Sequence, residues 1–203
     1  MDGANLVRLG SVTSTQDVAR DLPFGSIVVA DHQSAGRGRH DRRWEAPAGT
    51  ALLVSFVLER NPLLSLAAGV AAAQACGPAV RLKWPNDLMV GDQKLGGILV
   101  EATADRAICG VGINLTAAPE GAAMLNQPRD ELLAQLITAM DEWVGAPPER
   151  VLARWRERSA TLGRRVRIDV GHKSTEGLAE DLGPNGELIV DGFAFVAGSV
   201  THL

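Results

Sequence analysis

Hydrophobic residues in the first 160 positions fall into short runs, most of which have the pattern of buried strands. A β-branched stretch at 26–30 and an apolar stretch at 51–58 are each bounded by turn residues, which is typical of strands. The same reasoning predicts strands at 80–83, 87–90, 95–102 and 106–113, with a turn at Gly91 and Asp92. This part of the chain is therefore expected to form a sheet.

The segments between these strands have the pattern of helices. A hydroxyl residue, Thr13 or Ser14, can cap a short helix that follows it directly. Three longer helices are expected at about 62–76, at 129–144 and from 147 onward, two of them with proline at their start. Strands and helices together indicate a mixed α/β domain.

The pattern changes after residue 163. Val166, Ile168 and Val170 alternate with charged residues, and turn residues recur at 171, 184–186, 191–192 and 198. Such short strands predict a compact β-barrel. We therefore expect an α/β (α+β) fold with a larger domain at 1–159 and a small β domain at 160–203.

Composition excludes several classes of protein. The chain has 203 residues, 46% of them hydrophobic and 22% charged, so a packed core is expected rather than disorder. With a net charge of −4, any nucleic-acid site would have to be a local patch. Residues 1–5 lack the form of a signal peptide, and the apolar run at 63–76 is too short to span a bilayer. Cys76 and Cys109 are expected to be reduced thiols, so we predict a cytoplasmic protein.

A polar stretch from His32 to Gly49 is expected to be a long loop, and loops of this length usually have a function. Gly36 and Gly38 allow the backbone to approach a ligand closely, and Trp44 can stack on a base. The arginines of the stretch that suit phosphate oxygens are Arg37, Arg39 and Arg42. Alone, the stretch fits a phosphate-binding loop and a basic surface or nucleic-acid patch about equally well.

A second group of polar residues interrupts the apolar strands. Lys83, Asn86 and Asp87 belong to a Lys-Trp-Pro-Asn-Asp segment, in which Asp87 can bind Mg²⁺ or hold a basic partner. Lys94 precedes a buried strand and can neutralise a carboxylate or a phosphate. The segment Gly-Val-Gly-Ile-Asn at 110–114 again allows close backbone approach. These features favour a site for an anionic ligand.

The segments GRGR-xx-R-x-W, KWPND, KLGGILVE and GVGIN follow one another in this order. This order resembles that of the catalytic domain of the biotin–protein ligases, from about Val7 to Asn114. The segment after residue 160 is similar, less specifically, to the small SH3-like barrel of that family. Because only about a dozen residues precede Ser14, we expect the short form that lacks an N-terminal DNA-binding domain and has no repressor role.

The resemblance implies a role for each matching residue. It implies that biotin is contacted by Ser14, Thr15, Gln33, Gly36, Arg37, Gly38, Arg39, Lys94, Gly97, Gly110 and Gly112. It implies that the nucleotide is contacted by Arg39, Arg42, Trp44, Lys83, Asn86 and Asn114, with Asp87 at the Mg²⁺. The catalytic residues would be Lys94, Arg39 and Arg42. Gln16 stands where the family usually has Asn, and it is left out of the biotin site.

The resemblance also implies a reaction in two steps, with no permanently bound cofactor. The biotin carboxylate attacks the α-phosphate of ATP, with Mg²⁺, and the biotinyl-5'-AMP formed passes biotin to a lysine of a biotin carboxyl carrier protein domain. The loop from Gln33 to Trp44 is expected to be mobile without ligand and to close over the adenylate. No DNA or membrane partner is expected, and monomer or homodimer is left open.

Two other functions stay open at this point. An enzyme of the same superfamily that transfers lipoate or octanoate is disfavoured by the GRGR-xx-R-x-W and KWPND segments. A non-enzymatic module that binds nucleic acid through the basic loop is disfavoured by the net negative charge.

Overall fold

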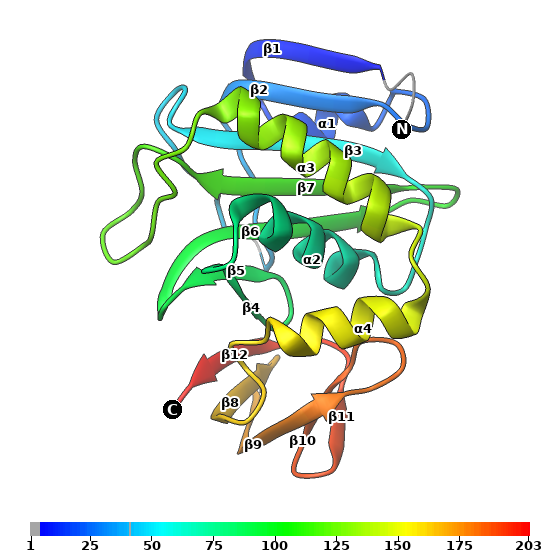
Figure 1. Cartoon of the computed structure of the whole chain (residues 1–203), viewed down its shortest axis with the longest axis vertical. Helices are drawn as coiled ribbons and strands as arrows, with labels where there is room; N and C mark the ends of the chain where they lie inside the picture. Colours follow the sequence, from blue (N-terminus) through cyan, green and yellow to red (C-terminus); the bar gives the residue numbers. More distant parts are fainter. Residues whose placement is uncertain (1–4, 41) are drawn as a thin grey trace.

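The chain folds into two sheets with helices between and upon them, as seen in a computed structural model (Figure 1). The structure describes residues 5–40 and 42–203, so most of the N-terminal stretch used in the signal-peptide prediction lies outside it. No helix within the described part of the chain is long and apolar enough to cross a membrane.

The larger sheet has seven strands in the order β1-β2-β3-β7-β6-β5-β4. They are β1 (Leu6–Val12), β2 (Ile27–Gln33), β3 (Ala51–Leu58), β4 (Arg81–Lys83), β5 (Asp87–Val90), β6 (Gln93–Ala102) and β7 (Ala107–Asn114). Only the β1–β2 pair is parallel, so the sheet is mixed. The strands expected from the sequence are confirmed to within a few residues at their ends, whereas β1 was not predicted.

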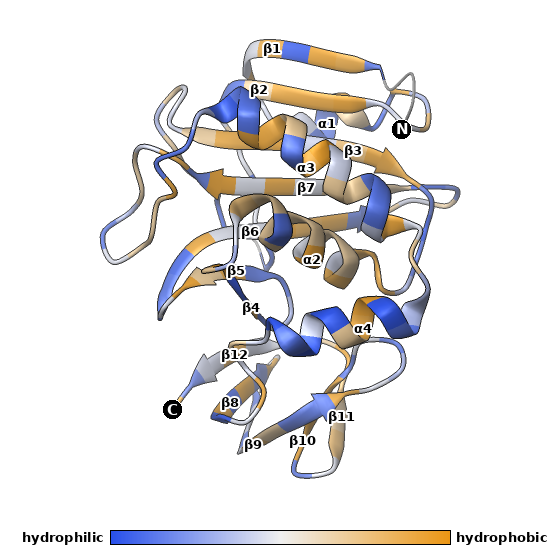
Figure 2. Cartoon of the chain, viewed as in Figure 1, coloured by the Kyte–Doolittle hydropathy of each residue, from blue (hydrophilic) through white to orange (hydrophobic). Residues whose placement is uncertain are grey.

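Helices α2 (Leu64–Cys76) and α3 (Arg129–Val144) cover one face of this sheet (Figure 1). Helix α2 is apolar on all sides because it packs against α3, α4 (Pro148–Glu157) and strands β4 to β7. Figure 2 shows this contrast, since α2 is mostly in hydrophobic colours whereas α4 carries long hydrophilic stretches. The main core therefore lies between the sheet and its helices.

The opposite face of the sheet is covered only in part. The short helix α1 (Thr15–Ala19) contributes Ala19 to a small cluster with Val28, Val57 and Ile108. Successive side chains of a strand point to opposite faces, so the residues between the core positions of β3 and β7 point to this side. Next to the cluster formed by Val57 and Ile108, three of these residues are small, namely Ser55, Gly110 and Gly112. A strip of sheet beside α1 therefore stays open.

The second sheet is antiparallel, with the order β11-β10-β9-β8-β12. Its strands are β8 (Arg165–Val170), β9 (Lys173–Leu182), β10 (Leu188–Val190), β11 (Phe193–Phe195) and β12 (Ser199–His202). This confirms the predicted small β unit. Strands β11 and β12 are the two edge strands of this order. Closure of the sheet into a barrel stays a prediction, and so does the domain boundary near residue 159.

Trp84 fixes the small sheet against the larger one. Its indole Nε1 donates to the Gly186 carbonyl at 2.9 Å, and its backbone N–H donates to Thr161 Oγ1 at 3.0 Å. The residues before β8 also pair with β4, because the Ala160 N–H donates to the Leu82 carbonyl at 2.8 Å. The start of β12 is thereby held beside the open strip of the larger sheet.

Candidate active site

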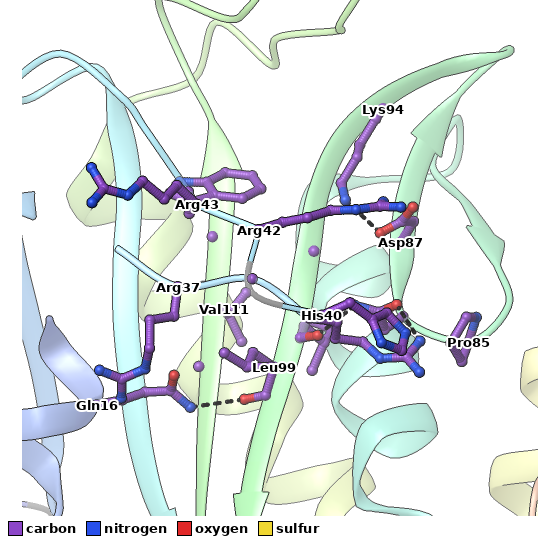
Figure 3. A pocket seen from close by; sticks show the side chains of 18 of the residues that line it. Gln16, Arg37, His40, Arg42, Arg43, Pro85, Asp87, Lys94, Leu99 and Val111 are labelled. Carbon is purple, nitrogen blue, oxygen red and sulfur yellow. Dashed lines mark hydrogen bonds and ion pairs between the residues drawn. The ribbon is translucent and has the colours of Figure 1, made fainter. Parts of the chain in front are cut away.

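A cavity of about 360 Å³ lies over the open strip of the larger sheet. Small-molecule sites have volumes of roughly 300–1,000 Å³, so the cavity is large enough for a small ligand. Its walls come from the start of α1, the loop after β2, the link between β4 and β5, strands β3, β6 and β7, and the start of β12. Figure 3 shows side chains from several of these elements around the cavity.

Most of the site residues predicted from the sequence line this cavity, although they come from distant segments. They are Ser14, Thr15, Gln33, Arg37, Gly38, Arg39, Arg42, Trp44, Lys83, Asn86, Asp87, Lys94, Gly97, Gly110 and Gly112. Gly36 and Asn114 are not among the residues that line it. The Asn114 amide instead donates to the Ala123 carbonyl at 3.0 Å and holds the segment that follows β7.

The floor of the cavity leaves little room for a side chain at two glycines. A Cβ atom at Gly112 would lie 2.8 Å from the Trp44 ring, and one at Gly110 would lie 3.1 Å from Cδ of Gln16. Gly36 has a related role outside the lining, because a Cβ atom there would lie 2.3 Å from the Trp44 carbonyl oxygen. These glycines let Trp44 and Gln16 lie directly on the backbone beneath them.

Neutral hydrogen-bonding groups gather at one end of the cavity, next to α1. Gln33 Oε1 accepts from the Thr15 backbone N–H at 2.8 Å and from Thr15 Oγ1 at 3.0 Å. Thr15 Oγ1 also lies 2.8 Å from Ser55 Oγ. Because the Gln33 carbonyl is held in this way, its amide N–H groups stay available as donors for a ligand.

Gln16 lines this end of the cavity as well, although the sequence had left it out. Its side-chain amide donates to the Leu99 carbonyl at 3.1 Å and to the Ile108 carbonyl at 3.3 Å (Figure 3). The residue is only 4% exposed. Gln16 therefore closes the end of the cavity by bridging the backbones of β6 and β7.

Basic side chains gather at the other end. Lys94 Nζ lies 2.6 Å from Asp87 Oδ1, and Figure 3 shows Arg42 extending in the direction of this pair. Arg39 donates to Asn86 Oδ1 at 3.2 Å and to the Gly198 carbonyl at 3.4 Å, while Asn86 donates to the Ile98 carbonyl at 2.7 Å. Arg39 thus connects the link between β4 and β5 with the residue that precedes β12.

Burial makes this end of the cavity a costly place for positive charge. The pKa of Arg39 is lowered, mainly by burial and also by Arg42, while Asp87 opposes the shift. The pKa of Lys83 is lowered in the same direction by burial and by the neighbouring cations, again opposed by Asp87. Asp87 is the carboxylate that offsets the positive charge of Arg39 and Lys83. An anionic ligand bound here would stabilise the charged forms of these side chains further.

The arginine loop, by which we mean residues 34–40 and 42–44, covers the cavity from above. The Gly38 N–H donates to the Arg42 carbonyl at 2.7 Å, and the Trp44 N–H donates to the Gly36 carbonyl at 3.0 Å. Trp44 Nε1 is buried without a hydrogen-bond partner. The predicted mobility of this loop in the absence of ligand stays a prediction.

The described residues do not form a metal site of their own. They include no group of three or more His, Cys, Asp or Glu side chains placed to hold a metal ion. Asp87 is a single carboxylate, and its Oδ1 is already paired with Lys94. A magnesium ion at this end would need most of its ligands from a bound phosphate and from water.

A cavity with neutral hydrogen-bonding groups at one end and several cations at the other defines a site for a small acid or a phosphate ester. The Biotin/lipoate A/B protein ligase family matches residues 9–115, which is more than half of the chain. The chain therefore belongs to this family.

Several known relatives and structures are similar to it. The chain is 35% identical to a biotin–[acetyl-CoA-carboxylase] ligase of Mycobacterium tuberculosis, over 88% of this chain and 79% of that protein. It is 31% identical to the bifunctional ligase/repressor BirA of Escherichia coli, over 94% of this chain and 70% of that protein. The structure of an Aquifex aeolicus biotin protein ligase in complex with biotin and ATP matches with a TM-score of 0.85, 26% identity and 98% coverage of both chains.

Proposed function

We propose that this protein is a biotin–protein ligase. It activates biotin with ATP to biotinyl-5'-AMP and transfers biotin to a lysine of a biotin carboxyl carrier protein domain. The observation that carries this proposal is the convergence of most of the predicted biotin and nucleotide residues on one cavity, in a chain whose relatives are named as such ligases.

The charge distribution of the cavity orients the acid. Thr15 and Gln33 present neutral donors and acceptors, which suit the ureido group of biotin. Lys94 and Arg39 lie at the other end, where they attract the carboxylate and the phosphates. Biotin therefore lies along the glycine floor with its carboxylate directed at the cationic end.

Lys94, Arg39 and Arg42 assist the first step. The carboxylate attacks the α-phosphorus and pyrophosphate leaves, so negative charge builds on the phosphate oxygens. Cations already fixed beside those oxygens stabilise this charge without reorganisation. The end of the Lys94 side chain passes beside Gly97, because a Cβ atom added at Gly97 would lie 3.6 Å from Lys94 Cε and Nζ, an ordinary contact distance.

Magnesium enters this scheme with ATP as part of the substrate. Mg²⁺ keeps several waters and is usually bound through one or two carboxylates and the substrate phosphates. Asp87 is the carboxylate that would be shared between the metal and Lys94. When bound, the metal would neutralise charge on the phosphates.

In the second step the amine of the carrier lysine attacks the acyl carbon of the mixed anhydride and displaces AMP. The arginine loop shields the adenylate from water until the carrier docks. Because the reaction consumes ATP and the two cysteines, Cys76 and Cys109, are free thiols, we place it in the cytoplasm.

Isothermal calorimetry with biotin, with and without ATP and Mg²⁺, tests the first step, and lipoate serves as the matched control acid. We expect tight biotin binding and no heat from lipoate. A transfer assay with a carrier domain and its acceptor Lys→Arg variant tests the second step. Lipoate binding in place of biotin would move the chain to the lipoate branch of its family.

A further inference from the structure

Arg37 is held by two carboxylates on elements that are distant in the sequence. Its Nε and Nη2 donate to Glu101 Oε1 and Oε2 of β6, both at 3.1 Å. Its Nη1 donates to Asp17 Oδ1 of α1 at 2.7 Å. Arg20, also near α1, donates to Glu101 Oε2 at 2.9 Å. The four side chains form a network of two cations and two carboxylates beside the neutral end of the cavity.

The hydrogen bonds to Glu101 and Asp17 occupy the Arg37 guanidinium, so it is not free to bind a ligand in the cavity. Its planar guanidinium uses two adjacent donors on one carboxylate and a third on another, which is the strong form of such pairing. The Arg37 side chain is 33% exposed, and its pKa is raised above the ordinary value, chiefly by the hydrogen bond to Glu101. In Figure 3 Arg37 points toward Gln16, away from Arg42 and Lys94.

Holding Arg37 also holds the loop that contains it. The residue lies between Gly36, whose carbonyl accepts from the Trp44 N–H, and Gly38, whose N–H donates to the Arg42 carbonyl. An anchor at Arg37 therefore limits the movement of both glycines relative to the sheet. Through them it limits the movement of Arg42 and Trp44.

We infer that Asp17 and Glu101 are positioning residues, which fasten the arginine loop over the cavity by binding Arg37. In this assignment the Arg37 guanidinium does not contact the substrate, and the residues of the loop that bind the phosphates are Arg39 and Arg42. The inference rests on the proposed ligase function only for the identity of the ligand. The attachment of the arginine loop through Arg37 does not depend on that function.

The test compares the wild type with Asp17→Asn, Glu101→Gln and the double variant. Trypsin cleaves after arginine, so cleavage between residues 37 and 43 reports loop opening without any ligand. We expect about tenfold faster cleavage in the double variant, as the loss of a charge-assisted pair predicts. The KM for biotin should rise by about the same factor, and AMP release without a carrier should increase, while kcat for pyrophosphate release stays within about twofold.

Asp130→Asn is the matched control, because it breaks an exposed ion pair of Asp130 with Arg8 that lies outside the cavity lining. It should change neither cleavage nor KM. Arg37→Lys keeps the charge without the paired donors, so an intermediate effect is expected. The inference would be overturned if Asp17→Asn and the double variant both kept the wild-type rate of trypsin cleavage, the wild-type KM for biotin and an unchanged melting temperature. If the wild type releases no pyrophosphate with biotin while cleavage still responds, the ligase proposal fails and the fastening stands.

Discussion

Lys94 Nζ lies 2.6 Å from Asp87 Oδ1, and both side chains line the cavity at its cationic end. The lysine comes from β6 and the aspartate from β5, and Lys94 pairs with Met89 in the ladder between these strands. The ion pair therefore holds the ammonium group in place before a substrate arrives.

Lys94→Ala should reduce adenylate formation strongly. Loss of one preorganised positive donor raises the barrier by about 3 to 4 kcal/mol, which lowers kcat by roughly 10² to 10³. Biotin-dependent pyrophosphate release measures this step. Lys173→Ala, at an exposed lysine on β9, is the control and should retain wild-type turnover. Near-normal turnover in Lys94→Ala would remove Lys94 from the catalytic residues.

Gly112→Ala should disturb the site without removing any functional side chain. The added Cβ would lie 2.8 Å from the Trp44 ring, so the ring or the loop must move. Such overpacking typically costs about 1–3 kcal/mol, and we expect it to appear mainly as a higher KM for ATP. Gly10→Ala is the matched control, because nothing lies within 4 Å of a Cβ atom there. Equal KM values in the two variants would contradict this role of Gly112.

The fold could be predicted where burial imposes a clear pattern on the sequence. The helix at 129–144 and the strands at 51–58 and 87–90 have the predicted bounds, since each has a buried apolar face or is buried throughout. Strand β1 was missed because it is the edge strand beside β2, and its residues are exposed or only partly buried. Exposure alternates along most of β1, but its sequence LVRLGSV has two adjacent apolar residues at its start and two adjacent small residues, so the apolar–polar alternation that predicts a strand is broken.

The candidate site could also be predicted only in part. Residues within motifs, such as Lys94 and Arg39, could be named because glycine and charge stand out among apolar strands. Gln16 was left out because the family usually has Asn at this position, and its hydrogen bonds reach carbonyl groups of β6 and β7 that lie more than 80 positions away. The Glu101 contact to Arg37 likewise spans 64 positions. Nothing in the local sequence indicates such long-range hydrogen bonds.

Trp84→Phe should weaken the attachment of the small sheet and with it the cavity wall. The change removes the indole N–H that donates to the Gly186 carbonyl, which costs about 1–3 kcal/mol if that oxygen stays buried without a partner. Because residues 198–201 line the cavity, the KM for ATP should rise as well.

Trp143→Phe is the control for this variant. It also removes an indole donor, which bonds to Gln74 Oε1 at 2.8 Å, but it does so between α3 and α2, away from the cavity lining. Urea unfolding should show a loss of stability in both variants, whereas only Trp84→Phe should change the KM. An unchanged KM for ATP in Trp84→Phe would mean that residues 198–201 keep their position without the hydrogen bond from Trp84 to Gly186.

His202 should make the folded state sensitive to acid. Its pKa is lowered to about 4 from an ordinary value of 6.5, first by burial and then by the positive charges of Lys83 and Arg164. Its Nδ1 lies 3.3 Å from Arg164 Nη1, so the ring accepts a hydrogen bond there and stays neutral. Between pH 6.5 and 4 the unfolded chain binds the extra proton, so this stabilisation is complete above pH 6.5 and is lost as the pH falls toward 4.

His202→Gln removes this proton linkage. Between pH 7 and pH 4.5 the free energy of unfolding of the wild type should fall further than that of the variant, by on the order of 1 kcal/mol once the partial exposure of the ring is taken into account. Urea unfolding at several pH values measures the difference, with His172→Gln, at an exposed histidine on the β8–β9 turn, as the control. If the curves of wild type and His202→Gln stay parallel over this range, the neutral state of His202 contributes nothing to stability, and the acid sensitivity of the fold must come from its carboxylates.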